Sequence, residues 1–570
     1  MPVNKKIVVL WFLALLLIVP ACAPPTRLPA DGEFAKSAAD IPDAYYYYFR
    51  AQLSEADQED DLAADHLLAA IEADPTSSYL ETELARLYLR DNKTAEALIH
   101  AKKAVSKDPT DSQARLLAAS LLSAMKRNDE AIAEYEDLLA REPENEGALL
   151  FLGTVYADLD RTDEAERIFD RLVSIRPDSH LAHYYLGRVA LDRKEYQKAE
   201  THLAKSVELN PDFVSALGDL AAVYEEEKKY DQAERIYRQL ISARPGGNIS
   251  KARLGRLLLQ TDRREEAKEV FGEILGAAKD PDKARLQIGL IYFENNSYDE
   301  AIQEFRLVLT EDPGNYRAVF YLGAALEEKQ DYRKAAEEFK KIPKDSELFA
   351  DARLHLAFLL SELDRVDEAI ASTIEAIEQV PEKITLYLSL GSVYESVDRY
   401  RDAAEILKKG LAIEPENVDL HFRLGAVLDK LGDKDQVIAR MKKVIALEPD
   451  HADGLNYLAY TWAEMGVNLE EALKLALQAL NLKPDNGFIT DTAAWVYYKQ
   501  GDYKAAVKYL ERAVELEPKD PVINEHLGDA YEKNGQFDQA LKTYKKVKEL
   551  GPKDVKSIDE KINKIEKKRP

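Results

Sequence analysis

Two histidines, His180 and His183, are the residues of this sequence whose type and spacing come nearest to those of a metal-binding site. Three residues apart, they share one face of a predicted helix, and neutral imidazole is a common ligand of transition metals. No third ligand follows at a recognisable spacing, and the single cysteine, Cys22, lies far away near the N-terminus. We therefore expect no metal site and interpret both histidines as polar residues of a helix.

The other groups that enzymes use lack the patterns that catalysis needs. The glycines form no phosphate-binding loop, and runs such as Glu225-Glu226-Glu227 are expected by chance when 104 of 570 residues are acidic. We predict no enzymatic activity, no catalytic residue and no cofactor. The net charge of −26 and the absence of a basic cluster also argue against a nucleic-acid partner.

The N-terminus has the pattern of a secretory leader. Lys5 and Lys6 precede an apolar run of 13 residues, 7–19, which is shorter than the roughly 20 residues that span a bilayer as a helix. The stretch Val19-Pro20-Ala21-Cys22 resembles the lipobox of bacterial lipoproteins. That resemblance implies a signal peptide over residues 1–21 and a diacylglycerol thioether on Cys22. There are two alternatives. One is an ordinary signal peptide with an incidental cysteine, and the other is an uncleaved helical anchor.

Residues 22–43 form an Ala- and Pro-rich segment with no apolar period, and we interpret them as a tether. Ala23, and not Asp, follows the cysteine. In Gram-negative lipoproteins, which this leader resembles, that choice implies sorting to the outer membrane. We therefore expect a lipid-anchored protein at the periplasmic face of that membrane, held there by the lipid alone.

A 34-residue period organises the rest of the chain. Prolines stand at 75, 109, 143, 177, 211 and 245 and return in register further on. The period defines 15 repeats over residues 44–554, with one inserted residue in 452–486. The eighth position is Gly or Ala in every repeat, and the twentieth is Ala in nearly all of them. Helices whose axes pass 8–10 Å apart need such small residues where they cross, so each repeat is predicted to be a helical hairpin that its proline ends.

This pattern resembles the tetratricopeptide repeat, a 34-residue helix–turn–helix unit. The resemblance implies an all-α, right-handed superhelical solenoid of about 15 repeats. Residues 555–570, with Ile558, Ile562 and Ile565 on one face, would form a C-terminal capping helix. Lys279 and Glu347 replace the expected proline, so we expect irregular junctions there.

In tetratricopeptide arrays the first helix of each repeat lines the concave side, and this implies a groove for a protein or an extended peptide. The matching positions carry Arg86, Arg188 and Arg256 early in the chain and Asp491, Glu525, Asp529 and Glu532 near its end. Between and among these lies a run of aromatic residues, which we predict to be the partner-binding wall: Phe293, Phe320, Phe358, Phe422, Tyr460, Trp495 and Tyr498. The alternative is that these rings pack against neighbouring helices.

The resemblance implies a periplasmic scaffold for protein–protein interaction, serving the assembly or export of an envelope structure. The alternative is an exopolysaccharide-export lipoprotein whose groove contacts polysaccharide, since aromatic platforms also stack on sugars. No stretch outside the array is long enough to hold a catalytic domain.

Replacing Cys22 tests the predicted lipid anchor. The Cys22→Ser variant should lose lipid-dependent processing and move to the soluble fraction when cells are fractionated, because its serine cannot form the thioether. A variant that stays membrane-bound and is processed like the parent would contradict the lipoprotein interpretation.

Overall fold

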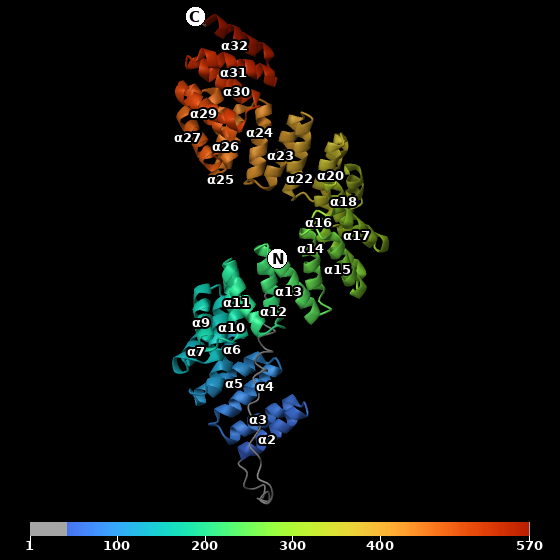
Figure 1. Ribbon diagram of the computed structural model, residues 1–570, viewed down its shortest axis with the longest axis vertical. Coiled ribbons are helices and arrows are strands. Elements are labelled where there is room, and N and C mark those ends of the chain that lie inside the picture. The colour runs from blue at the N-terminus through green and yellow to red at the C-terminus, as the bar shows by residue number, and fades with distance from the viewer. Residues whose placement is uncertain (1–42, 569–570) are drawn as a thin grey trace, which may run out of the picture. The chain divides into compact units, whose positions relative to one another are not determined.

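The computed structural model describes residues 43–568, and within this range every regular element is an α-helix (Figure 1). The 31 helices of this range form 15 successive hairpins and one final helix, α32. The predicted all-α solenoid of about 15 helix–turn–helix repeats is therefore confirmed. The expected signal peptide, Cys22 and the tether lie outside the described residues.

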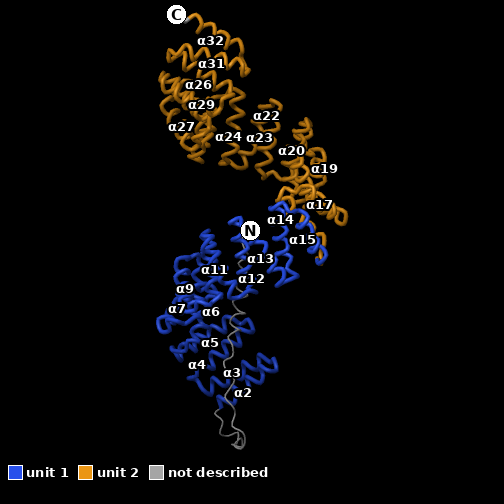
Figure 2. Tube along the Cα trace, viewed as in Figure 1, with its two compact units in different colours: residues 1–277 blue, residues 278–570 orange. Residues whose placement is uncertain are grey.

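The chain divides into two compact units, and the first ends at Ala277 (Figure 2). Its helices are α2 Asp43–Ala56, α3 Asp60–Ala73, α4 Ser78–Arg90, α5 Thr94–Lys107, α6 Ser112–Ala124, α7 Asn128–Arg141, α8 Glu146–Asp158, α9 Thr162–Ile175, α10 His180–Asp192, α11 Tyr196–Leu209, α12 Val214–Glu226, α13 Tyr230–Ala243, α14 Asn248–Gln260 and α15 Arg264–Ala277.

The second compact unit begins at Ala278. Its helices are α16 Pro281–Glu294, α17 Tyr298–Glu311, α18 Tyr316–Glu328, α19 Tyr332–Lys340, α20 Phe349–Glu362, α21 Val366–Gln379, α22 Ile384–Ser396, α23 Tyr400–Ile413, α24 Val418–Lys430, α25 Lys434–Leu447, α26 Ala452–Met465, α27 Leu469–Leu482, α28 Gly487–Gln500, α29 Tyr503–Leu516, α30 Pro521–Lys533, α31 Phe537–Leu550 and α32 Val555–Lys568.

Each hairpin turns on one left-handed residue at the fifteenth position of its repeat. These residues have φ between 57° and 87°, yet only the last four are glycine; the others include Asn92, Lys194 and Lys228. The next N–H donates to the carbonyl of the eleventh position, as Arg161 does to Tyr156 at 2.9 Å. This 6→1 bond is that of a Schellman motif, which satisfies a carbonyl at the end of the first helix. A tight turn of this kind holds the two helices of a hairpin side by side.

Small and large side chains interlock where the two helices cross. The twentieth-position residues, Ala97 and Ala403 among them, have no exposed surface. The eighth-position glycine faces a bulky side chain sixteen residues later, as Gly153 faces Phe169 and Gly391 faces Leu407. A Cβ atom added at Gly153 would overlap the Phe169 ring. Glycine is therefore required there by the close approach of the ring.

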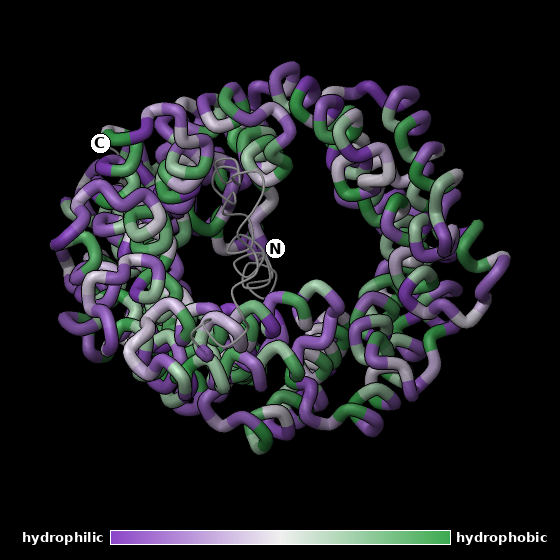
Figure 3. Tube along the Cα trace, turned by 90° about the horizontal axis from the view of Figure 1, so that it is seen from below, coloured by the Kyte–Doolittle hydropathy of each residue, from purple (hydrophilic) through white to green (hydrophobic). Residues whose placement is uncertain are grey.

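Hairpins stack in series within each compact unit. Each second helix packs on the first helix of the next hairpin, as α5 does on α6 and α29 on α30. Hydrophobic stretches alternate with hydrophilic ones along the helices (Figure 3), as expected of elements buried on one side only. Every hairpin therefore depends chiefly on its immediate neighbours.

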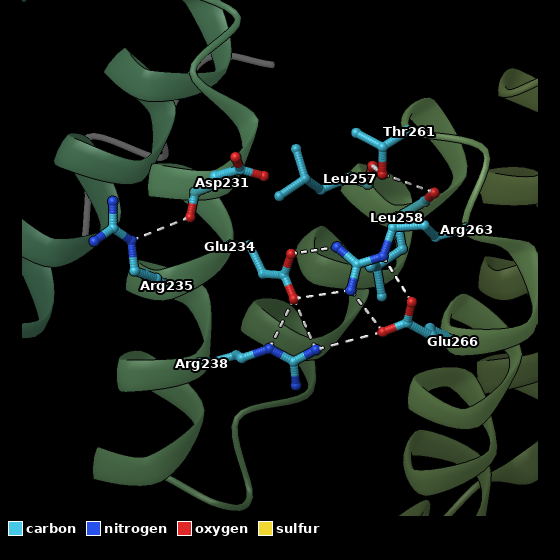
Figure 4. A network of polar contacts seen from close by, with 9 residues as sticks. All are labelled: Asp231, Glu234, Arg235, Arg238, Leu257, Leu258, Thr261, Arg263 and Glu266. Atoms are coloured by element: carbon cyan, nitrogen blue, oxygen red, sulfur yellow. Dashed lines mark hydrogen bonds and ion pairs between the residues drawn. The ribbon is translucent and has the colours of Figure 1, made fainter.

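Ion pairs link successive second helices of the first compact unit. Arg263, just before α15, bonds Glu266 at the start of that helix and Glu234 on α13 (Figure 4). Arg238 also pairs with Glu234, at 2.8 Å. Lys93 and Lys229 occupy the same position in other repeats and pair with Asp61 and Glu200 of the preceding second helix. All these pairs are at least partly exposed, so each contributes little alone, but together they fix the register of neighbouring hairpins.

The expected irregular junctions coincide with breaks in the pattern. Lys279 follows the boundary between the compact units, and α19, which precedes Glu347, has only nine residues. The buried Arg353 donates to the carbonyl oxygens of Phe339 and Ile342 at 3.0 and 3.4 Å, which satisfies backbone groups that the short helix leaves open.

The two described ends of the chain differ. In α32, Ile558 and Ile565 are fully buried against the preceding hairpin. In α2, Tyr46 and Leu53 are about half exposed (50% and 48%), although later repeats mostly bury these positions against the preceding hairpin. Among the described residues, the N-terminal end of the stack is thus the one that leaves apolar side chains uncovered.

Adding one methyl group at two equivalent glycines tests the interlocked crossing. In Gly255→Ala the new Cβ overlaps the Phe271 ring, so we expect a loss of about 1–3 kcal/mol in the free energy of unfolding. In the control Gly391→Ala the Cβ lies 3.0 Å from a terminal methyl of Leu407, which can rotate away, so the change should be within about 1 kcal/mol.

Hydrogen exchange locates the damage from Gly255→Ala. Deprotection should be confined to α14, α15 and the hairpins beside them, because contacts in the stack are local. Loss of protection spread evenly over residues 43–568 would contradict a solenoid.

Candidate functional site: the first-helix face

The first helices form the inner side of each compact unit. Successive first helices pack on one another, as α4 does on α6, α8 on α10, α26 on α28 and α28 on α30, whereas no two second helices of the described chain pack to a comparable extent. The first helices therefore lie closer together than the second helices. The side chains that they do not bury within the hairpins share one surface on this inner side, which we call the first-helix face. The predicted groove residues belong to these helices.

The three arginines predicted early in the groove are each paired with an acid. Arg86 bonds Glu83 at 2.8 Å, and Arg256 bonds Glu225 at 3.0 Å. Arg188 lies 3.7 Å from Asp219 and donates to the Tyr184 hydroxyl. Because these cations are already paired, this part of the face is not an open site for an anionic partner.

The central aromatic residues form one cluster, with Phe358 at its edge. The Phe293 ring contacts Tyr321 at 6.0 Å, and Tyr321 in turn contacts Phe320 at 5.6 Å. Phe320 also lies edge-on to the Phe339 and His355 rings, each at 5.4 Å.

Phe358, on α20, differs from the other predicted wall residues in its exposure. Its side chain is 49% exposed, and the Tyr332 ring lies 6.2 Å away. The other six rings are half-buried or buried. Phe358 is thus the wall residue with the most surface to offer a partner.

Phe422 and Tyr460 lie further along the second compact unit. Phe422 contacts His451 at 5.3 Å and Tyr457 at 6.1 Å. Burial, followed by the nearby Glu464 and Asp491 carboxylates, raises the pKa of Tyr460 above its usual range. Both rings are half-buried. Each therefore packs against neighbouring side chains and also leaves part of its surface exposed to solvent.

Trp495 lies inside the wall, and not on its surface. It is 8% exposed and is stacked between Tyr498 at 4.6 Å and His526 at 3.9 Å. Its Nε1 donates to Glu464 at 2.6 Å, and the Lys499 ammonium lies 5.0 Å from the ring centroid. Trp495 therefore joins α26, α28 and α30, and its first role is stability.

A buried ion pair supports this stack. His526 Nδ1 lies 2.9 Å from an Asp491 oxygen, and both side chains are almost fully buried. Burial alone would lower the pKa of His526, but the carboxylates of Asp491, Asp529 and Glu464 outweigh it and raise that pKa. The protonated imidazole and the Asp491 carboxylate thus compensate each other in a site that excludes water.

Three of the four acidic residues predicted at the end of the groove pair with lysines of α32. Lys561 bonds Glu525 at 2.8 Å and Asp529 at 2.6 Å, and Lys564 bonds Glu532 at 2.9 Å. The final helix thus covers these carboxylates as well as the apolar end of the stack.

The sequence alone did not suggest two partners in this region, Glu464 and His526. A usable signal exists, because side chains 31 residues apart meet repeatedly on this face: Arg256 with Glu225, Arg423 with Ser392, and Trp495 with Glu464. A search at that spacing would have found Glu464. His526 is 35 residues from Asp491, one more than a repeat, and the period by itself does not pair them.

Residues 43–568 contain no group of three or more His, Cys, Asp and Glu side chains arranged to hold a metal ion. Over the same range, each helix is too short or too polar to cross a membrane.

Helical hairpins stacked in series define an α-solenoid, and sequence comparison assigns its family. Models of the tetratricopeptide repeat match residues 122–188, 190–253, 292–348, 397–459 and 497–560, and a second such model matches 82–146 and 252–316. The chain belongs to the tetratricopeptide-repeat family, whose members serve as scaffolds for protein–protein interaction. No curated protein sequence matches the chain.

Three solved structures are among those similar to this chain. The Cut9–Hcn1 hetero-tetramer of APC/C is similar over 92% of this chain and 96% of that one, with 14% identity and a TM-score of 0.37. A tetratricopeptide repeat protein from Parabacteroides merdae covers 44% of this chain and 98% of its own, with 19% identity and a TM-score of 0.33. YrrB, described as having an unusual peptide-binding site, covers 33% and 92%, with 26% identity and a TM-score of 0.27.

The ion pair makes stability depend on pH. Because the pKa of His526 is raised on folding, its contribution is fully present below the unfolded value of about 6.5 and is lost as pH rises through the folded value. His526→Gln should therefore cost about 1.5–3 kcal/mol near pH 6, the range for a hydrogen bond to a charged group, and less at higher pH.

Denaturant melts of parent and variant between pH 5.5 and 9 measure this difference. The control is His451→Gln, which removes a partly buried imidazole that caps α26 by accepting the Gly454 N–H at 3.0 Å, so the cost of this change should not fall as pH rises. A stability difference between parent and His526→Gln that is constant over this range would contradict a charged His526 in the folded state.

Proposed function

We propose that this protein is a lipid-anchored scaffold whose first-helix face in the second compact unit binds an extended segment of a partner protein. The family supplies the class of function. The exposed ring of Phe358, on a face whose other predicted wall rings are at least partly buried, is the observation that carries the location. Aromatic side chains are enriched at protein–protein interfaces and among the residues that dominate binding energy.

The surroundings of Phe358 fit a protein ligand. Tyr332 presents a second ring 6.2 Å away, and His355, on the same helix, is hydrogen-bonded to Glu327 at 2.8 Å. An exposed apolar ring next to a polar, partly exposed pair offers a peptide one apolar contact and one hydrogen-bonding contact.

The cellular setting is proposed from the N-terminal sequence. The leader and Cys22 favour a lipoprotein, and Ala23 favours the periplasmic face of the outer membrane. There a scaffold without a catalytic centre of its own would serve the assembly or export of an envelope structure by holding its components together.

Substituting Phe358 separates recognition from stability. Phe358→Ala should leave the free energy of unfolding within about 0.5 kcal/mol of the parent, as at other exposed sites. It should weaken partner binding by about 2 kcal/mol if the ring is a binding anchor. The control is Leu307→Ala, which removes a side chain of similar exposure (44%) from the second helix α17.

The partner is found by placing a photoreactive amino acid at position 358 or 307 in cells and identifying the cross-linked products. The same purified partner then serves for affinity measurements with each variant. Equal losses from Phe358→Ala and Leu307→Ala, or none from either, would remove Phe358 from the site. A glycan array with the parent protein tests the alternative of a polysaccharide ligand.

A further inference from the structure

Two histidines meet across one hairpin, outside the first-helix face. His183, near the start of α10, and His202, in the middle of α11, place their Nδ1 atoms 3.2 Å apart, the distance of a hydrogen bond between the two rings. His183 is 9% exposed and His202 is half-buried. His180, the other histidine of α10, is directed elsewhere and lies edge-on to Phe213 at 5.3 Å.

The same two repeat positions hold complementary charges in other hairpins. The fourth and twenty-third positions pair Glu81 with His100 at 2.6 Å, Arg115 with Glu134 at 2.6 Å, and Arg285 with Glu304 at 2.9 Å. His183 and His202 occupy these positions in their hairpin. Here two nitrogen bases face each other where those hairpins place an acid and a base.

A backbone carbonyl fixes the tautomer of His183. Its Nε2 lies 3.2 Å from the Pro177 carbonyl oxygen, which can only accept a hydrogen bond, so the proton of the neutral ring is on Nε2. Nδ1 of His183 therefore presents a lone pair toward His202. A second hydrogen bond of this kind is how proteins orient histidine ligands of metals.

The electrostatics of His202 favour the neutral, metal-binding form. Burial lowers its pKa, and the neighbouring His183 lowers it further. Lys198 acts in the same direction, and the carboxylates of Asp170 and Glu166 act in the opposite one. Glu166 is itself paired with Arg193 and Lys198, so Asp170 is the carboxylate of the two with no such ion pair in the structure.

The spacing and the space around the pair also fit a metal ion. With Zn–N bonds of about 2.0–2.1 Å, two ligands at a tetrahedral angle have nitrogens about 3.3 Å apart. A hollow of ≈ 510 Å³ adjoins both rings, with Thr201, Lys205 and Glu208 in its lining. Lys205 pairs with Glu208 at 2.8 Å, so its ammonium is held by that carboxylate. Water molecules can complete the coordination from this open side.

We propose that His183 and His202 bind one late first-row divalent ion, such as Zn²⁺, through their two Nδ1 atoms, with water as the remaining ligands. For this, the ion replaces the hydrogen bond between the two Nδ1 atoms, and the proton of His202 moves from Nδ1 to Nε2 by exchange with solvent, so that both rings stay neutral. Two imidazoles prefer such ions to Mg²⁺ or Ca²⁺, which take oxygen ligands. The ion would then clamp α10 to α11 within a single hairpin.

Isothermal titration of the full chain with Zn²⁺, and separately with Mg²⁺, tests the site. We expect one Zn²⁺ ion per chain and no comparable binding of Mg²⁺. The variants His183→Gln and His202→Gln should each weaken Zn²⁺ binding at least about tenfold, a loss that even outer-shell partners of a metal can cause. At position 183, glutamine can still donate to the Pro177 carbonyl, so folding should be preserved.

Two further histidines provide matched controls. His421 holds the same fourth position and contacts the Pro415 carbonyl oxygen at 2.9 Å, but its partner is Arg440. His180→Gln and His421→Gln should leave Zn²⁺ affinity unchanged. Thermal unfolding gives an independent readout, because Zn²⁺ should raise the Tm of the parent and of these controls but not of the two site variants.

Three outcomes would overturn the proposal. They are the absence of saturable Zn²⁺ binding, binding retained by both His183→Gln and His202→Gln, and an equal loss in the His180→Gln or His421→Gln control. A result of the last kind would place the ion elsewhere on the chain.

Discussion

The fold depends on one contact that each hairpin repeats, the close crossing of its two helices at a small residue. Where the eighth residue is glycine, a bulky side chain from the second helix rests on the exposed backbone, as Phe271 does on Gly255. The contact excludes water, fixes the distance between the helices and leaves no room for a Cβ atom. The same contact recurs in successive hairpins. Each hairpin therefore presents a similar packing surface to the next one, and the hairpins stack.

The regular stack determines what the first-helix face can do. Since adjacent first helices are close, side chains 31 residues apart meet, and most polar groups there are satisfied by one another. Arg256 with Glu225 and Trp495 with Glu464 are examples. Such internal pairing leaves fewer polar groups for a ligand, which is why the exposed ring among the predicted wall residues, that of Phe358, carries weight for recognition.

The same repetition explains how an unusual site arises without disturbing the fold. In several hairpins the fourth and twenty-third positions bring two side chains together, as they do His421 and Arg440. In three hairpins the pair joins an acid and a base, as Arg115 with Glu134 does. With histidine at both positions, as in His183 and His202, the existing hairpin geometry places two imidazole nitrogens 3.2 Å apart without any change in the backbone arrangement. A repeat protein can thus acquire a binding site by two substitutions in register.

The sequence by itself determined the elements of this protein and their order. The 34-residue period, the small eighth and twentieth residues and the terminal proline are local signals, and each acts through contacts inside one hairpin or with the next. The family and the stacking of hairpins could be predicted for that reason. The left-handed turn residue at Lys194 or Lys228 escaped prediction, because the packing of the two helices imposes that conformation and the side chain does not favour it.

The tertiary structure alone decided which of the expected site residues face solvent and which side chains meet. Phe358 and Trp495 occupy the same repeat position, and both were therefore predicted to line the groove. Phe358 is 49% exposed, whereas Trp495 is 8% exposed. Trp495 is covered by His526 of the next hairpin and bonded to Glu464 of the previous one. Likewise His183 pairs with His202 across its hairpin and not with His180 on its own helix. Exposure and pairing depend on the side chains that neighbouring hairpins supply at each crossing, and a period shared by all repeats cannot specify those differences.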